Sequence, residues 1–322
     1  MQDSWQREIN YLRISITDRC NLRCQYCLPK DNFIFIEHKE ILTYDEIKQI
    51  VLLVAIPLGV TKIRLTGGEP LVRKNASKLI EMLSCIPQIK DLSLTTNGIL
   101  LEQYANQMYK SGLKRINISL DSLQEEKYKE ITCGGDLKKV IKGINLALNT
   151  GFEPIKINTV LMKGINDDEI ISFCKLTLDL PLHIRFIELM PFGSRRIYSD
   201  ENFIPVQDAK KNIEKYFELS PVKIKGNGPA EYFEIKGARG SIGFITPISN
   251  CFCDRCNRLR LTADGKLKTC LFAIEEIDLK TPLRNGATPE ELQNIAKIAI
   301  ANKQKQHNNK FFNTRIMSQI GG

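Results

Sequence analysis

The chain has 322 residues, of which 43% are hydrophobic and 26% are charged, a globular composition that excludes an intrinsically disordered chain. At about 150 residues per domain, this length predicts two domains or one large barrel with an appendage. The 46 basic and 37 acidic residues give a net charge of +9, which favours an anionic partner. Charge alone does not distinguish a nucleotide, an RNA and a membrane surface.

The sequence predicts neither export nor insertion into a membrane. The longest apolar run covers only residues 50–60, which is too short to cross a bilayer. The amino terminus includes Asp3, Arg7 and Glu8 and holds no apolar core, so it lacks the pattern of a signal peptide. We therefore expect a cytoplasmic protein without a membrane partner.

Six β-rich runs alternate with helical patterns over the first two thirds of the chain. Thr43 and Glu46 form a capping-box pattern that begins the first long helix, and Gly59 ends it. Further helices are expected over Leu100–Ser111 and Asp136–Thr150, each followed by a glycine. The expected strands are Tyr11–Thr17, Lys62–Thr66, Asp91–Thr95, Arg115–Leu120, Ile155–Leu161 and His183–Leu189.

Repeated strand–helix units build a parallel sheet with right-handed crossovers. Eight such units close a complete TIM barrel, and this chain shows six. We therefore predict an α/β fold with an incomplete (β/α)6 TIM-like barrel. The pattern alone leaves a doubly wound sheet open as the alternative.

The pattern changes after about Met190. A helix is expected over Pro205–Phe217, and another over Thr288–Asn302. We place a domain boundary near residue 220, so that residues 1–220 form the partial barrel and residues 221–322 form a smaller mixed domain that covers its open side. The strands expected in this part are Ala230–Ile235, Ser241–Ile245 and Arg258–Thr262.

Most of the ten cysteines lie in two groups. Because no export signal accompanies them, ligation of a metal or a cluster is favoured over a disulfide framework. The isolated Cys85 and Cys174 are predicted to be small buried side chains. The first group is Cys20, Cys24 and Cys27, and the second is Cys251, Cys253, Cys256 and Cys270.

Cys20, Cys24 and Cys27 have C-x3-C-x2-C spacing directly after the first predicted strand. A structural zinc site needs four ligands, whereas three thiolates can hold three irons of a 4Fe–4S cluster and leave the fourth iron open. An open iron can take the amine and carboxylate of S-adenosylmethionine (SAM), whose cleavage at a cluster yields a carbon radical. A structural or chance triplet is the alternative.

This run resembles the signature of the radical SAM enzymes, C-x3-C-x-aromatic-C, with Tyr26 in the aromatic position. After the second strand, Thr66–Pro70 looks like the glycine motif with which those enzymes receive the amino group of the cofactor. Two glycines permit close approach of backbone, and a glutamate offers a carboxylate to an ammonium. The resemblance implies that SAM is bound by Tyr26, Gly68, Glu69, Ser119 and Met190.

In the second group, Cys253 and Cys256 form a C-x2-C pair, and Cys270 follows. Together with Cys251 they could form a four-thiolate zinc ribbon. The string Asn257–Gly265, however, is similar to one family, the GTP 3',8-cyclases of molybdenum cofactor biosynthesis. That resemblance implies a second 4Fe–4S cluster, held by Cys253, Cys256 and Cys270, whose open iron faces the guanine of GTP. Cys251 lies outside the family pattern, as an inert thiol or a fourth ligand.

Arg258 and Arg260 are two positions apart, so on a strand they share one face beside the second cysteine group. Guanidinium forks bind phosphate oxygens bidentately, which predicts a polyphosphate clamp, with a solvated basic strand edge as the alternative. Each charge-assisted bond contributes about 1.5–3 kcal/mol. The family resemblance implies that GTP is bound by Arg13, Lys62, Arg64, Thr95, Lys156, Arg258 and Arg260.

By resemblance, the radical formed from SAM takes the 3' hydrogen of GTP, and the ribose carbon then attacks C8 of the guanine. The implied product is (8S)-3',8-cyclo-7,8-dihydroguanosine 5'-triphosphate, the first intermediate toward molybdopterin, with Arg13, Arg258 and Arg260 close to the reacting centre. The expected partners are an electron donor, a downstream cyclic pyranopterin monophosphate synthase and a second copy in a homodimer. The terminal Gly321-Gly322 is implied to enter the active site, against the alternative of a frayed end.

Two other functions compete with this interpretation. A peptide-modifying radical enzyme with an auxiliary cluster would carry more cysteines in its tail. A zinc-ribbon RNA-binding protein would suit the basic charge, but it leaves the amino-terminal cysteines unexplained, and 7% aromatic residues offer few stacking surfaces. We therefore expect no nucleic-acid partner.

Overall fold

The computed structural model describes residues 1–28, 33–191, 199, 201–224, 228–307 and 315–321. The strands of this part of the chain join in one twelve-stranded sheet. They are β1 (Tyr11–Ser15), β2 (Lys62–Thr66), β3 (Asp91–Thr96), β4 (Arg115–Ser119), β5 (Ile155–Leu161), β6 (Leu182–Glu188), β7 (Leu219–Val222), β8 (Glu231–Ile235), β9 (Ser241–Ile245), β10 (Arg258–Leu261), β11 (Lys266–Lys268) and β12 (Ile277–Asp278).

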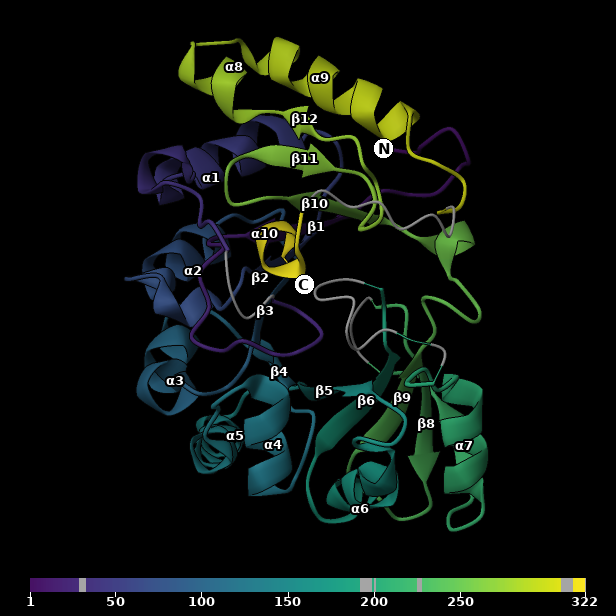
Figure 1. Ribbon diagram of the computed structural model, residues 1–322. Coiled ribbons are helices and arrows are strands. Elements are labelled where there is room, and N and C mark those ends of the chain that lie inside the picture. Colours follow the sequence, from purple (N-terminus) through teal and green to yellow (C-terminus); the bar gives the residue numbers. More distant parts are fainter. Residues whose placement is uncertain (29–32, 192–198, 200, 225–227, 308–314, 322) are drawn as a thin grey trace.

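The strands β1 to β6 lie side by side in chain order and run parallel. β10 adds to the free side of β1 and β9 to the free side of β6, both in parallel, and antiparallel strands continue the sheet at either end. Figure 1 shows these strands curving into an arc that is open on one side. The predicted incomplete barrel is therefore confirmed.

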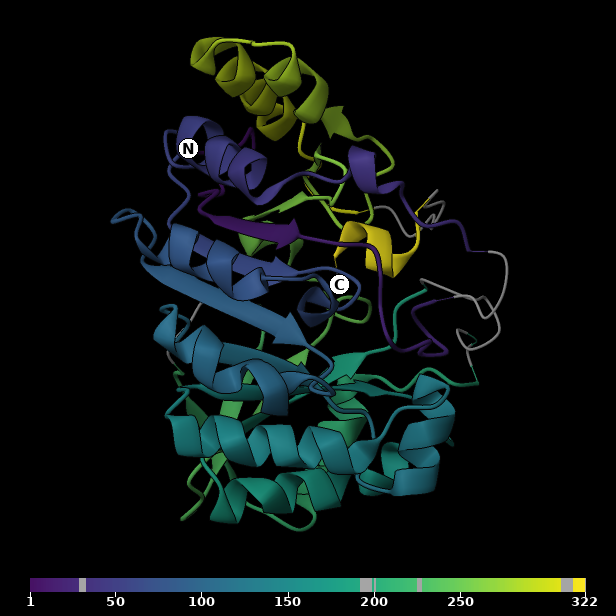
Figure 2. The same ribbon diagram turned by 90° about the vertical axis from the view of Figure 1, so that its left-hand side faces the viewer.

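Helices cover the convex side of the arc, as the side view in Figure 2 shows. The first helix begins as predicted, because Thr43 and Glu46 each cap the backbone N–H of the other. The helices are α1 (Tyr44–Ile50, continued by a π-helical turn Val51–Ala55), α2 (Ala76–Ser84), α3 (Leu101–Lys110), α4 (Glu125–Thr132), α5 (Leu137–Thr150), α6 (Ile170–Asp179), α7 (Val206–Glu214), α8 (Lys280–Arg284), α9 (Pro289–Ala301) and α10 (Met317–Ile320), with short 3-10 turns over His38–Glu40, Pro70–Val72, Asp167–Glu169 and Cys253–Arg255.

The alternation of side chains along each strand separates a packed face from a polar one. Ile14, Ile63 and Leu94 point outward and are fully buried in the core beneath the helices. Each such side chain stabilises the fold by roughly 1.5–3 kcal/mol. The intervening residues, such as Arg13 and Arg64, point inward, so the concave side of the arc is lined with polar and charged groups.

All nine predicted strands are present, with ends that differ by at most two residues from the predicted ones. The strands that follow residue 220 add to both ends of the barrel sheet, and β7 spans residue 220 itself. The division into two domains at that residue stays a prediction.

The two isolated cysteines differ in burial. Cys174 is fully buried in α6, as predicted. The prediction that Cys85 is buried is wrong, because this residue is exposed. Cys85 directly follows α2 and lies off the buried stripe that Leu79, Ile80 and Leu83 form on that helix. Within the described ranges, no helix combines the length and the apolar character needed to cross a membrane.

Candidate active site

A cavity of about 290 Å³ lies inside the arc, and both cysteine groups line it. The first group reaches it from the segment after β1, and the second from the segment before β10 and the segment after β11. The fold thus brings together residues as distant in the chain as Arg13 and Cys270. The predicted site residues that line the cavity are Arg13, Cys20, Cys24, Tyr26, Cys27, Arg64, Gly68, Thr95, Ser119, Met190, Cys253, Cys256, Arg258, Arg260 and Cys270.

The three amino-terminal thiols form one wall of the cavity. Burial raises the pKa of Cys20 to about 11 and that of Cys27 to about 12, and it also raises the pKa of Cys24. Buried thiolates are therefore costly unless a metal cation compensates their charge. Three such thiols beside open space suit a 4Fe–4S cluster with three cysteine ligands and one open iron. The donor set fits the cluster that the sequence predicts.

The glycines of the Thr66–Pro70 motif are required by the close approach of the segment that carries these cysteines. A Cβ atom on Gly67 would lie 2.6 Å from the carbonyl oxygen of Thr17, and one on Gly68 would lie 2.4 Å from that of Arg19. The Gly68 N–H also donates to Thr17 at 2.7 Å. The motif therefore holds the first cysteine segment against the end of β2.

Glu69 is 1% exposed and does not line the cavity in this structure. Its carboxylate accepts hydrogen bonds from the Asn97 N–H at 2.6 Å and from the Thr96 hydroxyl at 2.8 Å. Burial raises the pKa of Glu69 to about 7, although these hydrogen bonds act in the opposite direction and lower it. Glu69 thus joins the ends of β2 and β3 and positions Asn97, which lines the cavity. Its contact with SAM stays a prediction.

Tyr26 links the segment of the first cysteine group to β5 through Asp121. Its hydroxyl donates to Asp121 Oδ2 at 2.7 Å, and Asp121 Oδ1 accepts the backbone N–H of Val160 at 2.8 Å. Burial raises the pKa of Asp121 to about 6. Since Ser119 and Met190 line the same cavity, four of the five predicted SAM contacts are on its wall.

The second cysteine group meets a positively charged environment. Burial opposes ionisation of Cys256, but the charges of Arg258 and Lys303 outweigh burial and lower its pKa to about 6. This thiol is therefore ionised near neutral pH, which is the form that ligates metals. Cys253 and Cys270 lie on the same wall, so this donor set also fits an iron–sulfur cluster.

Buried guanidinium groups gather beside the second cysteine group. Arg13 in β1 stands opposite Arg260 in β10 and opposite Arg64 in β2. Burial and the neighbouring charge of Arg258 lower the pKa of Arg260 to about 10. Burial, followed by the charge of Arg260, also lowers the pKa of Arg13. Like charges buried this closely favour a polyanionic ligand that neutralises them.

Two of the predicted GTP-binding residues, Lys62 and Lys156, do not line the cavity. Lys62 is the first residue of β2, at the amino ends of the strands. Lys156 is 5% exposed, and burial together with the charge of Arg185 lowers its pKa to about 6. Its ammonium lies 5.1 Å from the centre of the Tyr232 ring. Contact of these two lysines with GTP stays a prediction.

The cavity wall also holds polar residues that the sequence did not identify, among them Asn158 in β5 and Arg185 in β6, which stand opposite each other. Asn158 Oδ1, Arg185 Nε and Thr95 Oγ1 are buried without a hydrogen-bond partner among the described residues. A bound ligand can satisfy these atoms. The alternation of Arg185 with the apolar Ile184 and Phe186 is the signal that could have identified it.

The end of the described chain lies against the cavity. Met317 and Ser318 of α10 line it, and Arg260 donates a hydrogen bond to the carbonyl oxygen of Gly321. Gly321 has a φ of +81°, and a Cβ atom there would lie 2.7 Å from Thr66 Cγ2. Arg315 anchors this segment through an ion pair with Asp264 at 2.8 Å. Gly322 lies outside the described residues.

Comparison with known families agrees with this geometry. Residues 14–177 match the model of the radical SAM superfamily. Residues 182–309 match the model of the Molybdenum Cofactor Synthesis C family. The first match contains one cysteine group and the second contains the other.

Curated relatives resemble the chain over its full length. The GTP 3',8-cyclase of Moorella thermoacetica is 50% identical, and that of Pelotomaculum thermopropionicum is 49% identical, each covering 100% of both chains. The GTP 3',8-cyclase of Syntrophomonas wolfei is 49% identical with the same coverage.

Among solved structures, Streptococcus suis SuiB matches with a TM-score of 0.60 and 14% identity, over 82% of this chain and 60% of that one. This likeness supports the fold alone. The two family models and the full-length identity, together with two cysteine groups on one cavity, show that the chain belongs to the GTP 3',8-cyclase family and is a radical SAM enzyme whose cofactors are SAM and two 4Fe–4S clusters.

Proposed function

We propose that this chain converts GTP into (8S)-3',8-cyclo-7,8-dihydroguanosine 5'-triphosphate by joining C3' of the ribose to C8 of the guanine. One observation carries the proposal: the two cysteine groups line the same cavity as Arg13, Arg258 and Arg260. A nucleotide held by these arginines lies between the two groups, within reach of both. Full-length relatives that bear the name GTP 3',8-cyclase support the choice of substrate.

Cys20, Cys24 and Cys27 hold the first cluster, which when bound supplies the electron that cleaves SAM and so the radical that takes the 3' hydrogen. Tyr26, Gly68, Ser119 and Met190 orient SAM from the cavity wall. Glu69 lies behind that wall and positions Asn97.

The arginines bind the triphosphate and the reacting part of the nucleotide. A triphosphate carries about four negative charges, and each charge-assisted hydrogen bond contributes about 1.5–3 kcal/mol. Arg13 and Arg260 stand side by side on β1 and β10, which lets one phosphate group span both. Arg64 and Thr95 extend this surface on the neighbouring strands, and Lys62 and Lys156 supply charge from the amino ends of the strands.

Cys253, Cys256 and Cys270 hold the second cluster, which orients the guanine. α10 lies over the cavity and limits the access of water to the radical. We further propose that the enzyme is a cytoplasmic homodimer that passes its product to a cyclic pyranopterin monophosphate synthase. A separate donor supplies two electrons per turnover: one cleaves SAM, and the other, together with a proton, reduces the radical left on the guanine after C3' has joined C8.

The direct test is an oxygen-free assay of the purified, cluster-loaded protein with GTP, SAM and a strong reductant. We expect deoxyadenosine and the cyclic nucleotide to form in equal amounts, with about eight irons per chain. Deoxyadenosine without any modified nucleotide, or zinc in place of iron and sulfide, would contradict the proposal.

Replacing Cys256 with serine is expected to stop cyclisation while SAM cleavage continues slowly. The two cysteine groups are separate in the chain, so the first cluster keeps all three of its ligands. Iron content is expected to fall from about eight to about four per chain. Cyclic nucleotide and deoxyadenosine are measured from the same reaction. A variant that makes the cyclic nucleotide at nearly the wild-type rate would show that the second cluster is only structural.

A further inference from the structure

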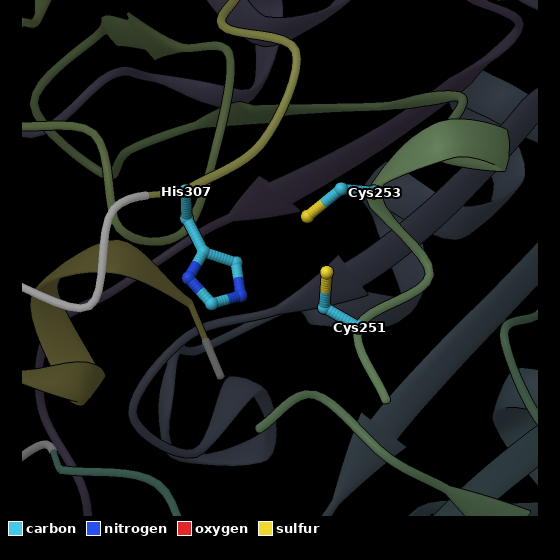
Figure 3. Close-up of side chains that lie close together, drawn as sticks. All are labelled: Cys251, Cys253 and His307. Carbon is cyan, nitrogen blue, oxygen red and sulfur yellow. The ribbon is translucent and has the colours of Figure 1, made fainter. Parts of the chain in front are cut away.

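Cys251 belongs to a group of metal-ligating side chains that shares only Cys253 with the proposed cluster ligands. The Sγ atoms of Cys251 and Cys253 and an imidazole nitrogen of His307 all lie within 4.8 Å of one another. Figure 3 shows the two sulfur atoms facing each other, with the imidazole ring of His307 beside them. Ligands of a tetrahedral zinc ion with bonds of about 2.3 Å lie about 3.7 Å apart, so small shifts of these side chains suffice to bind one ion.

Two buried cations bring these residues together from distant parts of the chain. The Arg7 guanidinium donates to the carbonyl oxygen of Cys253 at 2.6 Å and to that of Lys305 at 2.9 Å. It is itself held by Asp3 at 2.6 Å. Lys303 donates to the carbonyl oxygen of Arg258 at 3.2 Å. The segment that leads to His307 is therefore fixed against the second cysteine group by the fold itself.

Neighbouring side chains orient the ligands. Gln306 Nε2 donates to Cys251 Sγ at 3.0 Å, and the ring of His307 packs against Phe272 with centroids 4.4 Å apart. One nitrogen of His307, Nε2, lies 3.1 Å from the carbonyl oxygen of Pro247, while Nδ1 is buried without a hydrogen-bond partner among the described residues. The imidazole thus keeps a nitrogen lone pair that no protein donor occupies, as a metal ligand requires.

We propose that Cys251, Cys253 and His307 bind a single divalent transition-metal ion of the zinc type in the chain that lacks its second cluster. Two thiolates and one imidazole are borderline-soft ligands, which suit zinc rather than magnesium or calcium. Binding displaces the two thiol protons, and no change of redox state is involved. Three protein ligands leave one coordination position for water.

The ion and the second cluster share Cys253, so the two exclude each other. A chain that has taken up zinc cannot complete the cluster, and a loaded chain has no free Cys253 thiolate for the ion. This exclusion rests on the proposed ligand set of the cluster, whereas ion binding to the cluster-free chain does not rest on the proposed function.

The probe is Co²⁺, whose visible absorption reports tetrahedral coordination and whose near-ultraviolet bands report bound thiolates. Full-length, cluster-free protein is titrated without oxygen, with Cys20, Cys24 and Cys27 replaced by serine so that the first group cannot contribute. Thermal unfolding of each variant without metal verifies that it is folded.

We expect one Co²⁺ per chain in a tetrahedral site with two thiolates. Cys251→Ser and His307→Gln should each weaken Co²⁺ binding more than about 10-fold, since changes even behind a ligand cost 10- to 100-fold. Cys270→Ser is the matched control and should leave the affinity unchanged. Loss of binding in Cys270→Ser with none in Cys251→Ser would overturn the proposal, because the ion would then use the cluster ligands. Absence of tetrahedral Co²⁺ would overturn it as well.

A second arm titrates the chain after its second cluster has been loaded, and we expect no tetrahedral Co²⁺ there. The contrary result is that the loaded chain binds Co²⁺ undiminished, while Cys251→Ser and His307→Gln still weaken binding. That result would support the ion site and overturn the exclusion. It would also show that Cys253 is not a cluster ligand. The failure of the ion site and the failure of the cluster assignment are thus distinguishable.

Discussion

Replacement of Cys24 by serine is expected to abolish the formation of deoxyadenosine from SAM. Cys24 lies between Cys20 and Cys27 on the cavity wall, and two remaining thiolates cannot hold a cluster that keeps one iron open. The measurement is the yield of deoxyadenosine from purified, reduced protein without oxygen, with iron content determined on the same sample. Iron is expected to fall by about half, to roughly four per chain.

The matched control is Cys85→Ser, which changes an exposed thiol that does not line the cavity. It is expected to cleave SAM and bind iron like the unmodified protein. Wild-type cleavage by Cys24→Ser would refute the assignment of the first cluster to these three cysteines.

Arg260→Ala is expected to lose the cyclic nucleotide while both clusters stay intact. Arg260 is 6% exposed, lines the cavity opposite Arg13, and donates to the carbonyl oxygen of Gly321. Removing one partner of a buried charge pair costs about 2–5 kcal/mol, which corresponds to roughly 30-fold to several-thousand-fold weaker binding. GTP affinity and product formation are measured together, and iron content verifies the clusters.

Arg255→Ala is the control for charge, because Arg255 lies five residues earlier on the surface and pairs with Glu231 there. Its side chain is 62% exposed, so its loss is expected to change GTP binding by less than about 0.5 kcal/mol. If Arg260→Ala bound and converted GTP as well as Arg255→Ala does, the proposed phosphate clamp would be wrong.

The barrel strands could be predicted because local patterns determine them. Along β2, for example, Ile63 and Leu65 face the helices while Arg64 faces the cavity, and this alternation is visible in the sequence. The pairing of β10 with β1 could not be predicted, because it joins segments about 250 residues apart and depends on closure of the whole arc.

The candidate site, too, could be predicted from the sequence only in part. Fixed spacing identified the cysteines, and the structure places both groups on one cavity. No spacing links Cys251 to His307, whose proximity depends on hydrogen bonds from Arg7 to the two segments that carry them. Glu69 was identified by its motif, but only the packed structure shows that its carboxylate is occupied by Thr96 and Asn97.

The strand order also has a consequence for the sequence of events during folding. β9 and β10 follow each other in the chain, yet they lie at opposite edges of the eight parallel strands. A flat sheet of eight strands is about 34 Å wide. The segment 246–257 reaches roughly 45 Å at full extension, so it would be nearly stretched out across a flat sheet, and the curvature of the arc brings its two ends closer together. The first cysteine group contacts β1, β2 and the segment 121–132 after β4, all of which precede β5 in the chain. We therefore expect its binding site to form early, and the second site to form last, when the slow, long-range pairing of β10 with β1 completes the native state.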